Sequence, residues 1–483
     1  MTRTSYIVVG GGPAGLFTAL LLGMSGHRVT VIERQAVLGG CHRVDRVAGR
    51  FSEHGPRIYV TNYLCYRQFL ALCGLDFDEH YIDYKYGFLV GWEGLREALT
   101  RAELAKYAAL YALFIVNPDS FRTVSVERTF RGFSKRAIDY LDKMCTLTDG
   151  ARASDYTAHA FFSIFDQNAL YRIVEPTQAN DKWLWPAVRQ TLARSNVTVV
   201  RDQAMHIIEA GGRALGVQCT SRAYLADRVV LATPPAATAL IMAASSPIVA
   251  NAFMPRAEWP AYVDENTYIP YLSFTVHFDT PQELPNVWGN GFGEWGVAWI
   301  VMSDYFTNES PTLISGLIHD LDTVSRVTGA TANQTTDADA MTREAYRQLA
   351  QVLGIDEKPN AIVLNPSVYY ADGRWRTHDV PFMNTHRTKF VPAIGRVPNL
   401  SWVGPHNGQN SYPFTSMESV CENVYAFCAQ EEPQVRNLIQ PRYVLTLSIV
   451  IRSLFITITL LYLVRKAGAK VDDPRAKPAA QGW

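Results

Sequence analysis

Three glycines near the start of the chain have a spacing that binds phosphate. Gly10, Gly12 and Gly15 follow the apolar stretch Tyr6–Val9. In this spacing the first glycine permits a tight turn and the second lets backbone amides approach a pyrophosphate. The third lets the next helix pack closely on the strand, and that helix points its positive end at the phosphates. These residues predict a nucleotide cofactor.

An acid completes the pattern. Glu33 ends a second apolar stretch, where its carboxylate can accept hydrogen bonds from the hydroxyls of a ribose. The predicted elements follow in the order of a nucleotide-binding unit: a strand, a glycine turn, a helix, and a second strand that ends in an acid. Their agreement supports the prediction of a nucleotide cofactor. A signal peptide is the rival interpretation of 7–22, but its glycines and Pro13 fit poorly, and no convincing small-residue cleavage site follows. We expect Met1 to begin a mature domain that faces the cytosol.

Composition excludes some functions. The 483 residues contain 45 Lys and Arg and 45 Asp and Glu, so no global field attracts nucleic acid. The seven cysteines are scattered and never in CxxC spacing. We therefore expect neither a disulfide framework nor a metal site.

A long apolar run lies near the C-terminus. Tyr443 to Val464 covers the roughly 20 residues that a helix needs to cross a bilayer. Arg452 lies near its middle, where a charge costs about 2.5 to 3.5 kcal/mol on insertion scales. Two alternatives stay open: a membrane span whose arginine is paired or snorkels, or a helix lying partly in the membrane. A buried helix of the globular part is less favoured because the run lacks a polar face.

Nucleotide-type elements recur at three separated places. After the first, a β-meander and a buried strand are predicted over 197–231. The third is the strand before Gly404, followed by a helix that Thr415 or Ser416 caps. Helices are also predicted over 97–116 and 340–354. A simple NAD dehydrogenase would close its nucleotide domain in one continuous stretch.

This interleaving, with these motifs, resembles the FAD-dependent amine oxidase superfamily, which includes protoporphyrinogen oxidase and phytoene desaturase-like enzymes. The resemblance rests on the first glycine motif, Glu33-Arg34, the Gly39-Gly40 doublet, the strand 226–234, and Gly404 with the Met417 helix. It implies an α/β fold: a Rossmann-like FAD-binding domain of the glutathione reductase type 2, interleaved with a mixed-sheet and helical substrate domain. The implied segments are a first FAD-binding segment (1–90), a helical substrate or cap region (91–184), a second FAD-binding segment (185–245), a substrate-domain sheet (246–384), a third FAD-binding segment (385–430), and a C-terminal transmembrane or membrane-associated helix (443–464).

The resemblance also implies residues along the FAD. Glu33 would hold the adenosine ribose, Met205 the adenine through its backbone, and the Met417 amide would face the flavin edge that gains charge on reduction. The full implied set is Gly10, Gly12, Gly15, Glu33, Arg34, Gly40, Arg43, Gly55, Pro56, Arg57, Met205, Thr233, Gly404 and Met417.

Departures from the family pattern leave the reaction open. Cys41 and His42 stand where amine oxidases usually have arginine, and Pro405 replaces an acid. The stretch at Pro270-Tyr271 lacks the lysine that holds a water at the flavin in amine oxidases, and the 404–415 loop has no cysteine for a covalent flavin link. Amine oxidation specifically therefore does not follow from the resemblance.

Two groups of residues are candidates for chemistry. Arg57 and Tyr59 are expected at the ring face, although Arg57 could instead pair with Glu53. The loop before the Met417 helix offers three candidates for substrate contact: His406, Asn410 and Tyr412. His406 could instead serve only to order this loop.

Three functions remain in view. The favoured one is a membrane-anchored FAD-dependent oxidase, dehydrogenase or desaturase that takes a hydride from a small, lipophilic or amine substrate. The stretch 54–62 also looks like the ring-facing segment of UDP-galactopyranose mutases, which suggests a flavin-dependent sugar-nucleotide isomerase. The third is a non-enzymatic binding protein like the GDP-dissociation inhibitors, which bind lipidated partners without flavin.

Overall fold

A five-stranded parallel sheet forms the centre of the fold. The structure is a computed structural model, and it describes residues 4–85, 92–167, 170–267, 271–284, 289–412, 414–440, 442 and 444–471. The strand order is β20-β12-β1-β2-β8, and every neighbouring pair is parallel. The strands are β20 (Leu400–Trp402), β12 (Arg228–Leu231), β1 (Ser5–Val9), β2 (Arg28–Glu33) and β8 (Val197–Arg201). One sheet thus gathers three separated regions of the chain.

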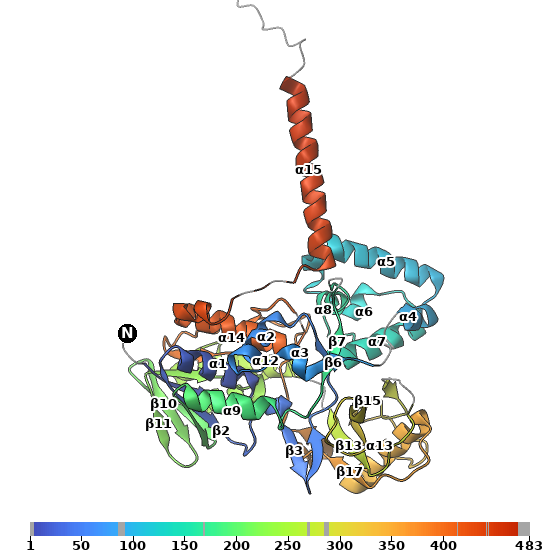
Figure 1. The fold of residues 1–483 in the computed structure, drawn as a ribbon, viewed down its shortest axis with the longest axis horizontal. Helices are drawn as coiled ribbons and strands as arrows, with labels where there is room; N and C mark the ends of the chain where they lie inside the picture. The colour runs from blue at the N-terminus through green and yellow to red at the C-terminus, as the bar shows by residue number, and fades with distance from the viewer. Residues whose placement is uncertain are drawn as a thin grey trace, which may run out of the picture.

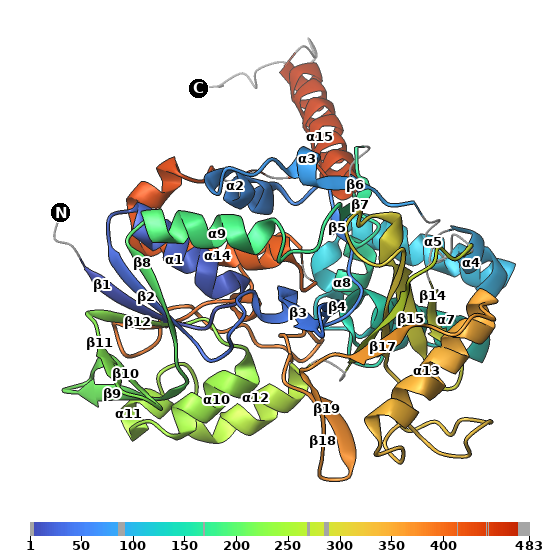
Figure 2. The same ribbon diagram turned by 60° about the horizontal axis from the view of Figure 1, so that its bottom comes forward.

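Helices cover one face of this sheet. They are α1 (Pro13–Met24), α9 (Leu184–Arg194) and α14 (Met417–Glu431), and they pack beside one another (Figure 2). The other face carries an antiparallel sheet of β9 (Ala204–Ala210), β10 (Arg213–Cys219) and β11 (Ala223–Leu225), with α10 (Pro235–Ala243) and α12 (Trp259–Glu265). Buried apolar side chains fill both faces, which is the pattern that parallel strands require.

A second, antiparallel sheet lies beside this layered unit. Its order is β14-β15-β16-β13-β17, and α13 (Ala338–Leu353) packs against it. Its strands are β14 (Gly289–Phe292), β15 (Val297–Val301), β16 (Thr312–Ile318), β13 (Leu272–Phe278) and β17 (Ala361–Leu364). A hairpin, β18 (Val368–Ala371) and β19 (Arg374–Thr377), follows β17.

Short strands join the two units. They are the β3–β4 hairpin (Val44–Val47, Arg50–Glu53) and the sheet of β5 (Tyr59–Val60), β7 (Ile173–Pro176) and β6 (Tyr81–Asp83). Next to them lie α2 (Leu64–Leu72) and α3 (Phe77–His80), and a helical layer of α4 (Trp92–Ala98), α5 (Arg101–Val116), α6 (Val126–Thr129), α7 (Lys135–Asp149) and α8 (Ala158–Ser163).

The helix expected over 97–116 is two helices. Thr100 caps α5 by accepting a hydrogen bond from the Glu103 amide, while the Glu103 carboxylate accepts from the Thr100 amide, so a new helix begins there. The helix expected over 340–354 is α13, which ends at a left-handed Gly354. Within the expected substrate-domain sheet (246–384), β13 begins at Leu272, and 268–270 lie outside the described residues.

The C-terminal helix α15 (Leu447–Val471) projects from the body (Figure 1). Within the described residues it is the one helix long and apolar enough to cross a membrane, over Leu447–Lys466. Tyr443, the expected first residue of the run, lies outside the described residues. Because the helix begins at Leu447, Arg452 lies in its second turn and not at its middle, and the guanidinium reaches back to the Ser448 carbonyl at 3.1 Å. The arginine therefore sits at the base of the helix.

Candidate functional site

The glycine turn between β1 and α1 has the geometry that the sequence predicts. Gly10 has a φ of +113°, and a Cβ on it would lie 2.7 Å from the Ala232 carbonyl oxygen. A Cβ on Gly15 would overlap the Gly10 carbonyl, so α1 approaches the turn as closely as backbone allows. Pro13 begins the helix, where its fixed φ and missing N–H cost nothing.

Gly12 faces Gly40 across a narrow crossing. A Cβ on Gly40 would lie 2.9 Å from the Gly12 Cα, and Gly40 has a φ of +54°. The Gly39 amide donates to the Gly11 carbonyl at 2.8 Å and locks the two segments together. The first turn of α1, which begins at Pro13, lies beside this crossing. Such a backbone cradle at a helix start fits a pyrophosphate.

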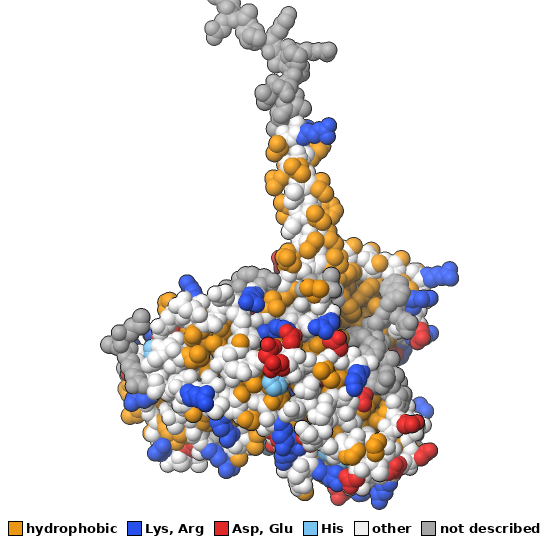
Figure 3. Space-filling view, in the orientation of Figure 1, with side chains coloured by type: hydrophobic (Ala, Val, Ile, Leu, Met, Phe, Trp, Pro, Cys, Tyr) orange, Lys and Arg blue, Asp and Glu red, His pale blue; other side chains and the backbone are white. Residues whose placement is uncertain are grey.

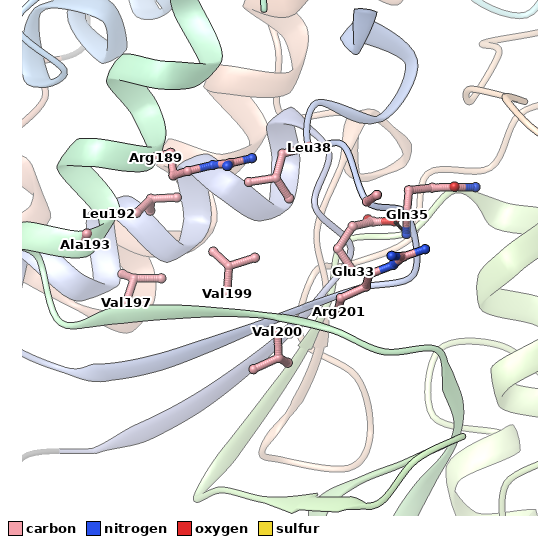
Figure 4. Close-up of a pocket in the computed structure, with 11 residues that line it drawn as sticks. Glu33, Gln35, Leu38, Arg189, Leu192, Ala193, Val197, Val199, Val200 and Arg201 are labelled. Atoms are coloured by element: carbon pink, nitrogen blue, oxygen red, sulfur yellow. Dashed lines mark hydrogen bonds between the residues drawn. The ribbon is translucent and has the colours of Figure 1, made fainter. Parts of the chain in front are cut away.

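Glu33 is held by backbone amides at the end of β2. Its carboxylate accepts from the Gly11 amide at 2.6 Å and from the Gln35 amide at 2.7 Å. A carboxylate has about four acceptor positions, so capacity for a ribose remains. Beside Glu33 lies a cavity of about 350 Å³, with Arg201 near the acid and Arg189 on the α9 side (Figure 4).

Four other residues that the sequence predicts at the cofactor lie outside the glycine turn and Glu33. Arg34 is exposed in the loop after β2, and Met205 is 45 % exposed on β9; neither lines the cavity. Thr233 follows β12, and its carbonyl accepts from the Trp402 indole at 2.9 Å. Gly404 is extended and its amide donates to the Asn407 side chain.

Arg43 lies in a buried ion-pair network. Its guanidinium donates twice to Asp379, both at 2.8 Å, and once to Asp45 at 3.1 Å. Two carboxylates therefore balance this buried charge, and the expected contact of Arg43 with the cofactor stays a prediction. The placement makes Arg43 a brace that holds the segment after Gly40 against the loop of Asp379.

The start of α14 is fixed by two further contacts. Ser416 caps the helix by accepting from the Ser419 amide, which leaves Met417 as its first residue. The buried Glu418 carboxylate accepts from the Cys65 and Tyr66 amides at 2.7 and 2.8 Å, at the start of α2. Burial, with Glu422 nearby, raises the pKa of Glu418 to about 8. The free amides of a helix start are thereby held in place.

Arg57 lies close to the glycine crossing. Its guanidinium donates to the Cys41 carbonyl at 2.8 Å, and its Nε lies 3.7 Å from Glu53. The pairing with Glu53 that the sequence left open is therefore present. Gly55 precedes it with a φ of +154°, and the His54 carbonyl accepts a hydrogen bond from Ser273 of β13. Gly55, Pro56 and Arg57 thus lie between the glycine crossing and the second sheet.

The groups around Arg57 are kept neutral by burial. The Tyr59 hydroxyl lies 3.4 Å from His42 Nδ1, and burial raises the pKa of Tyr59 to about 12. Burial also lowers the pKa of His42 well below its usual value and that of His54 to about 4. At neutral pH these three side chains are therefore uncharged beside the Arg57 guanidinium.

Glu175, on β7, is a site residue that the sequence analysis missed. It is 0 % exposed, and neither carboxyl oxygen has a hydrogen-bond partner among the described residues. Burial, reinforced by the nearby Glu53, raises the pKa of Glu175 well above the usual range, and Arg57 opposes the shift. Burial raises the pKa of Glu53 too. An acid inside the apolar stretch 173–176 was the signal available in the sequence.

The loop candidates do not meet at this face. His406 is buried and stacks on Trp402 at 3.7 Å between ring centroids, and burial lowers its pKa to about 3. This packing agrees with the alternative that His406 orders its loop, and its contact with substrate stays a prediction. Tyr412 is buried too, and its hydroxyl donates to Gln167 at 3.1 Å. Asn410 donates to the Tyr412 carbonyl.

A parallel sheet with a glycine-cornered first turn, an acid after β2 and a capped helix start at the far end of the chain defines a dinucleotide-binding flavoprotein. The family model for flavin-containing amine oxidoreductases matches residues 13–418, and the chain belongs to this family. It is an FAD-dependent oxidoreductase.

Curated relatives match only a short segment. L-amino acid oxidase Cdc18 from Crotalus durissus cumanensis is 33 % identical over 75 residues, which are 16 % of this chain and 15 % of the relative. Hydroxyneurosporene desaturase from Rubrivivax gelatinosus is 36 % identical over 74 residues, 15 % of this chain and 14 % of the relative. The chain thus spans about a seventh of the length of the relatives it matches.

Solved structures match nearly the whole chain. A putrescine oxidase bound to putrescine has a TM-score of 0.63 at 15 % identity, covering 89 % of this chain and 99 % of that chain. A putative protoporphyrinogen oxidase from Exiguobacterium sp. 255-15 has a TM-score of 0.60 at 15 % identity, covering 90 % and 100 %. At such identity these similarities establish the fold.

Proposed function

We propose that the protein is a membrane-anchored FAD-dependent oxidase, dehydrogenase or desaturase that takes a hydride from a lipophilic or amine substrate. One observation carries the proposal: Arg57 is tied to the carbonyl of Cys41, the residue directly after Gly40 of the glycine crossing. This contact puts the Arg57 face within reach of a cofactor whose pyrophosphate lies at the crossing.

The proposed roles follow from the placement of each residue. The glycine crossing would hold the pyrophosphate and Glu33 the ribose. Gly55 and Pro56 would let the flavin ring lie close to the backbone. Other residues would line the cofactor at its adenine, ribityl and flavin ends; these are Arg34, Met205, Thr233, Gly404 and the Met417 amide. Bound FAD supplies a ring that accepts a hydride from the substrate.

The chain's own groups would bind and orient the substrate. Arg57 and the Tyr59 hydroxyl would face it, and the α14 helix start would stabilise negative charge at the edge of the cofactor. Two carboxyls share one guanidinium here, so Glu175 can keep its proton while Glu53 balances Arg57.

A flavin assay tests this function. The purified full chain should show flavin absorbance, and anaerobic addition of one substrate class should bleach it; the panel would hold amines, polyenes, porphyrinogens and UDP-sugars. Turnover of a UDP-sugar without net bleaching would favour the mutase alternative. If flavin is absent and does not bind on reconstitution with FAD, the binding-protein alternative replaces both.

The proposed membrane anchor is α15. Its candidate span is almost entirely exposed, and its 18 residues from Leu447 to Val464 would extend about 27 Å at 1.5 Å per residue. That length approaches the hydrocarbon thickness of a bilayer. The hydroxyls of Thr457 and Thr459 donate to carbonyls one turn back, so they need no water. Resistance of the full chain to carbonate extraction from membranes would support the anchor, and its release into the soluble fraction would refute it.

A further inference from the structure

Helix α5 presents apolar side chains to the outside of the molecule. Leu113 is 51 % exposed and Val116 is 60 % exposed, while Tyr107 and Phe114 on the opposite side are buried. The exposed residues in the first half of α5 include two cations, Arg101 and Lys106, and Lys106 reaches back to the Arg131 carbonyl at 2.9 Å. From residue 107 to its end the exposed residues of α5 are all apolar: Ala108, Ala109, Ala112, Leu113 and Val116. A helix on the surface of a soluble protein usually turns charged or polar residues toward the solvent. The second half of α5 turns apolar residues outward instead.

This face adjoins the proposed membrane anchor. The base of α15 packs against the C-terminal end of α5, and α5 runs across the foot of α15 (Figure 1). In space-filling view, hydrophobic side chains continue from α15 onto α5 (Figure 3). The two helices therefore present one continuous apolar surface with a corner at the base of α15.

Polar and charged side chains make hydrogen bonds at the base of α15. The Ser448 amide donates to the buried Asp166 at 2.8 Å, and the Arg452 guanidinium donates to the Ser448 hydroxyl at 3.1 Å. The charge of Arg452 also lowers the pKa of Asp119, although the Arg122 side chain is the larger cause. From Ser453 to Val464 the helix carries only apolar and hydroxyl side chains. The charged groups on α15 thus end at its base, beside the C-terminal end of α5, and the next twelve residues of α15 carry none.

We propose that the exposed face of α5 lies in the interfacial layer of the bilayer that α15 crosses, as a second membrane contact. A lipid surface fits better than a protein partner because α15 rises from the same side and would hold that surface against the bilayer. Helices of this kind bury their apolar face about 5 to 10 Å into the interface. The proposal rests on the anchor of the proposed function, and it fixes which side of the protein faces the lipid.

Fluorescence quenching in vesicles tests it. The full chain is reconstituted in phosphatidylcholine vesicles, and an environment-sensitive dye is placed on Leu113→Cys, on Ile458→Cys in α15, or on Gln351→Cys as an exposed control on α13. The labelled wild-type chain gives the background from native cysteines, and flavin content shows that each variant is folded. Ile458 lies about 16 Å along α15 from Leu447, near the centre of a bilayer.

The expected pattern is ordered by depth. Nitroxide lipids labelled near the headgroup should quench the Leu113 dye more than nitroxide lipids labelled near the chain end, the reverse should hold for Ile458, and Gln351 should resist both. If the Ile458 dye is quenched while Leu113 behaves like Gln351, the α5 contact is refuted and the anchor stands. If neither dye is quenched, the anchor fails and the α5 contact fails with it.

Discussion

Replacing Glu175 with glutamine should remove a pH dependence from the stability of the protein. Glu175 is fully buried and its carboxyl oxygens have no hydrogen-bond partner among the described residues, so the folded chain favours its protonated form. Glutamine has nearly the same shape and is neutral at every pH. The variant therefore removes the titration without opening a cavity.

The magnitude follows from proton binding. In the unfolded chain a glutamate loses its proton near pH 4.3, whereas burial raises the pKa of Glu175 well above that value in the folded chain. Above pH 4.3 the folded state then binds one proton more, so the free energy of unfolding falls by about 1.4 kcal/mol per pH unit. This loss continues until the pH passes the folded pKa. Between these two pKa values the wild type should therefore lose stability as the pH rises, and Glu175→Gln should lack this slope.

Urea unfolding followed by circular dichroism, in one detergent at several pH values, measures this difference. The matched control is Glu79→Gln, an exposed acid on α3, which should keep the wild-type slope. If Glu175→Gln also keeps the wild-type slope, Glu175 is ionised in the folded protein and the electrostatic account of the Arg57 face is wrong.

Three further predictions concern positions away from Glu175. Gly40→Ala should lower the flavin-to-protein absorbance ratio, because its Cβ would lie 2.9 Å from the Gly12 Cα. Gly49→Ala should keep the ratio, because Gly49 has a similar left-handed φ but no atom within 4 Å of its Cβ position. Equal losses of flavin in the two variants would contradict the proposed pyrophosphate site. Asp379→Asn should lower the free energy of unfolding in urea by about 3 kcal/mol, because it removes a carboxylate that balances the buried guanidinium of Arg43. Asp279→Asn, which breaks the exposed ion pair with Arg50, should lower it by less than about 1 kcal/mol. Equal losses would show that burial of the Arg43 pair does not matter for stability. Asp166→Ala should speed amide hydrogen exchange at the first turn of α15, and unchanged exchange would show that this cap does not hold the helix.

The cofactor turn could be predicted because its signal is local. Gly10, Gly12 and Gly15 act through backbone geometry within a few residues, and Glu33 is the next strand end. The helix start at Met417 was visible for the same reason, since a capping serine directly precedes it. Patterns of this kind need no knowledge of which segments meet in space.

Contacts between distant segments could not be predicted. Arg43 and Asp379 are 336 residues apart in sequence, and nothing near either residue indicates that they pair. His406 resembled an active-site histidine because it lies in a polar loop, but its ring stacks on Trp402 of the preceding strand. The sequence shows that Glu175 interrupts the apolar stretch 173–176, but not that the fold buries it completely.

The order of strands in the central sheet bears on how the protein is made. β1 is the middle strand, and its neighbour β12 is synthesised more than 200 residues later; β20 and α14 follow near the end of the chain. Because contacts so distant in sequence form slowly, the nascent chain must hold an incomplete sheet with open edges during most of its synthesis. The proposed cofactor site can close only once α14 has emerged, and the long apolar helix α15 is synthesised after it.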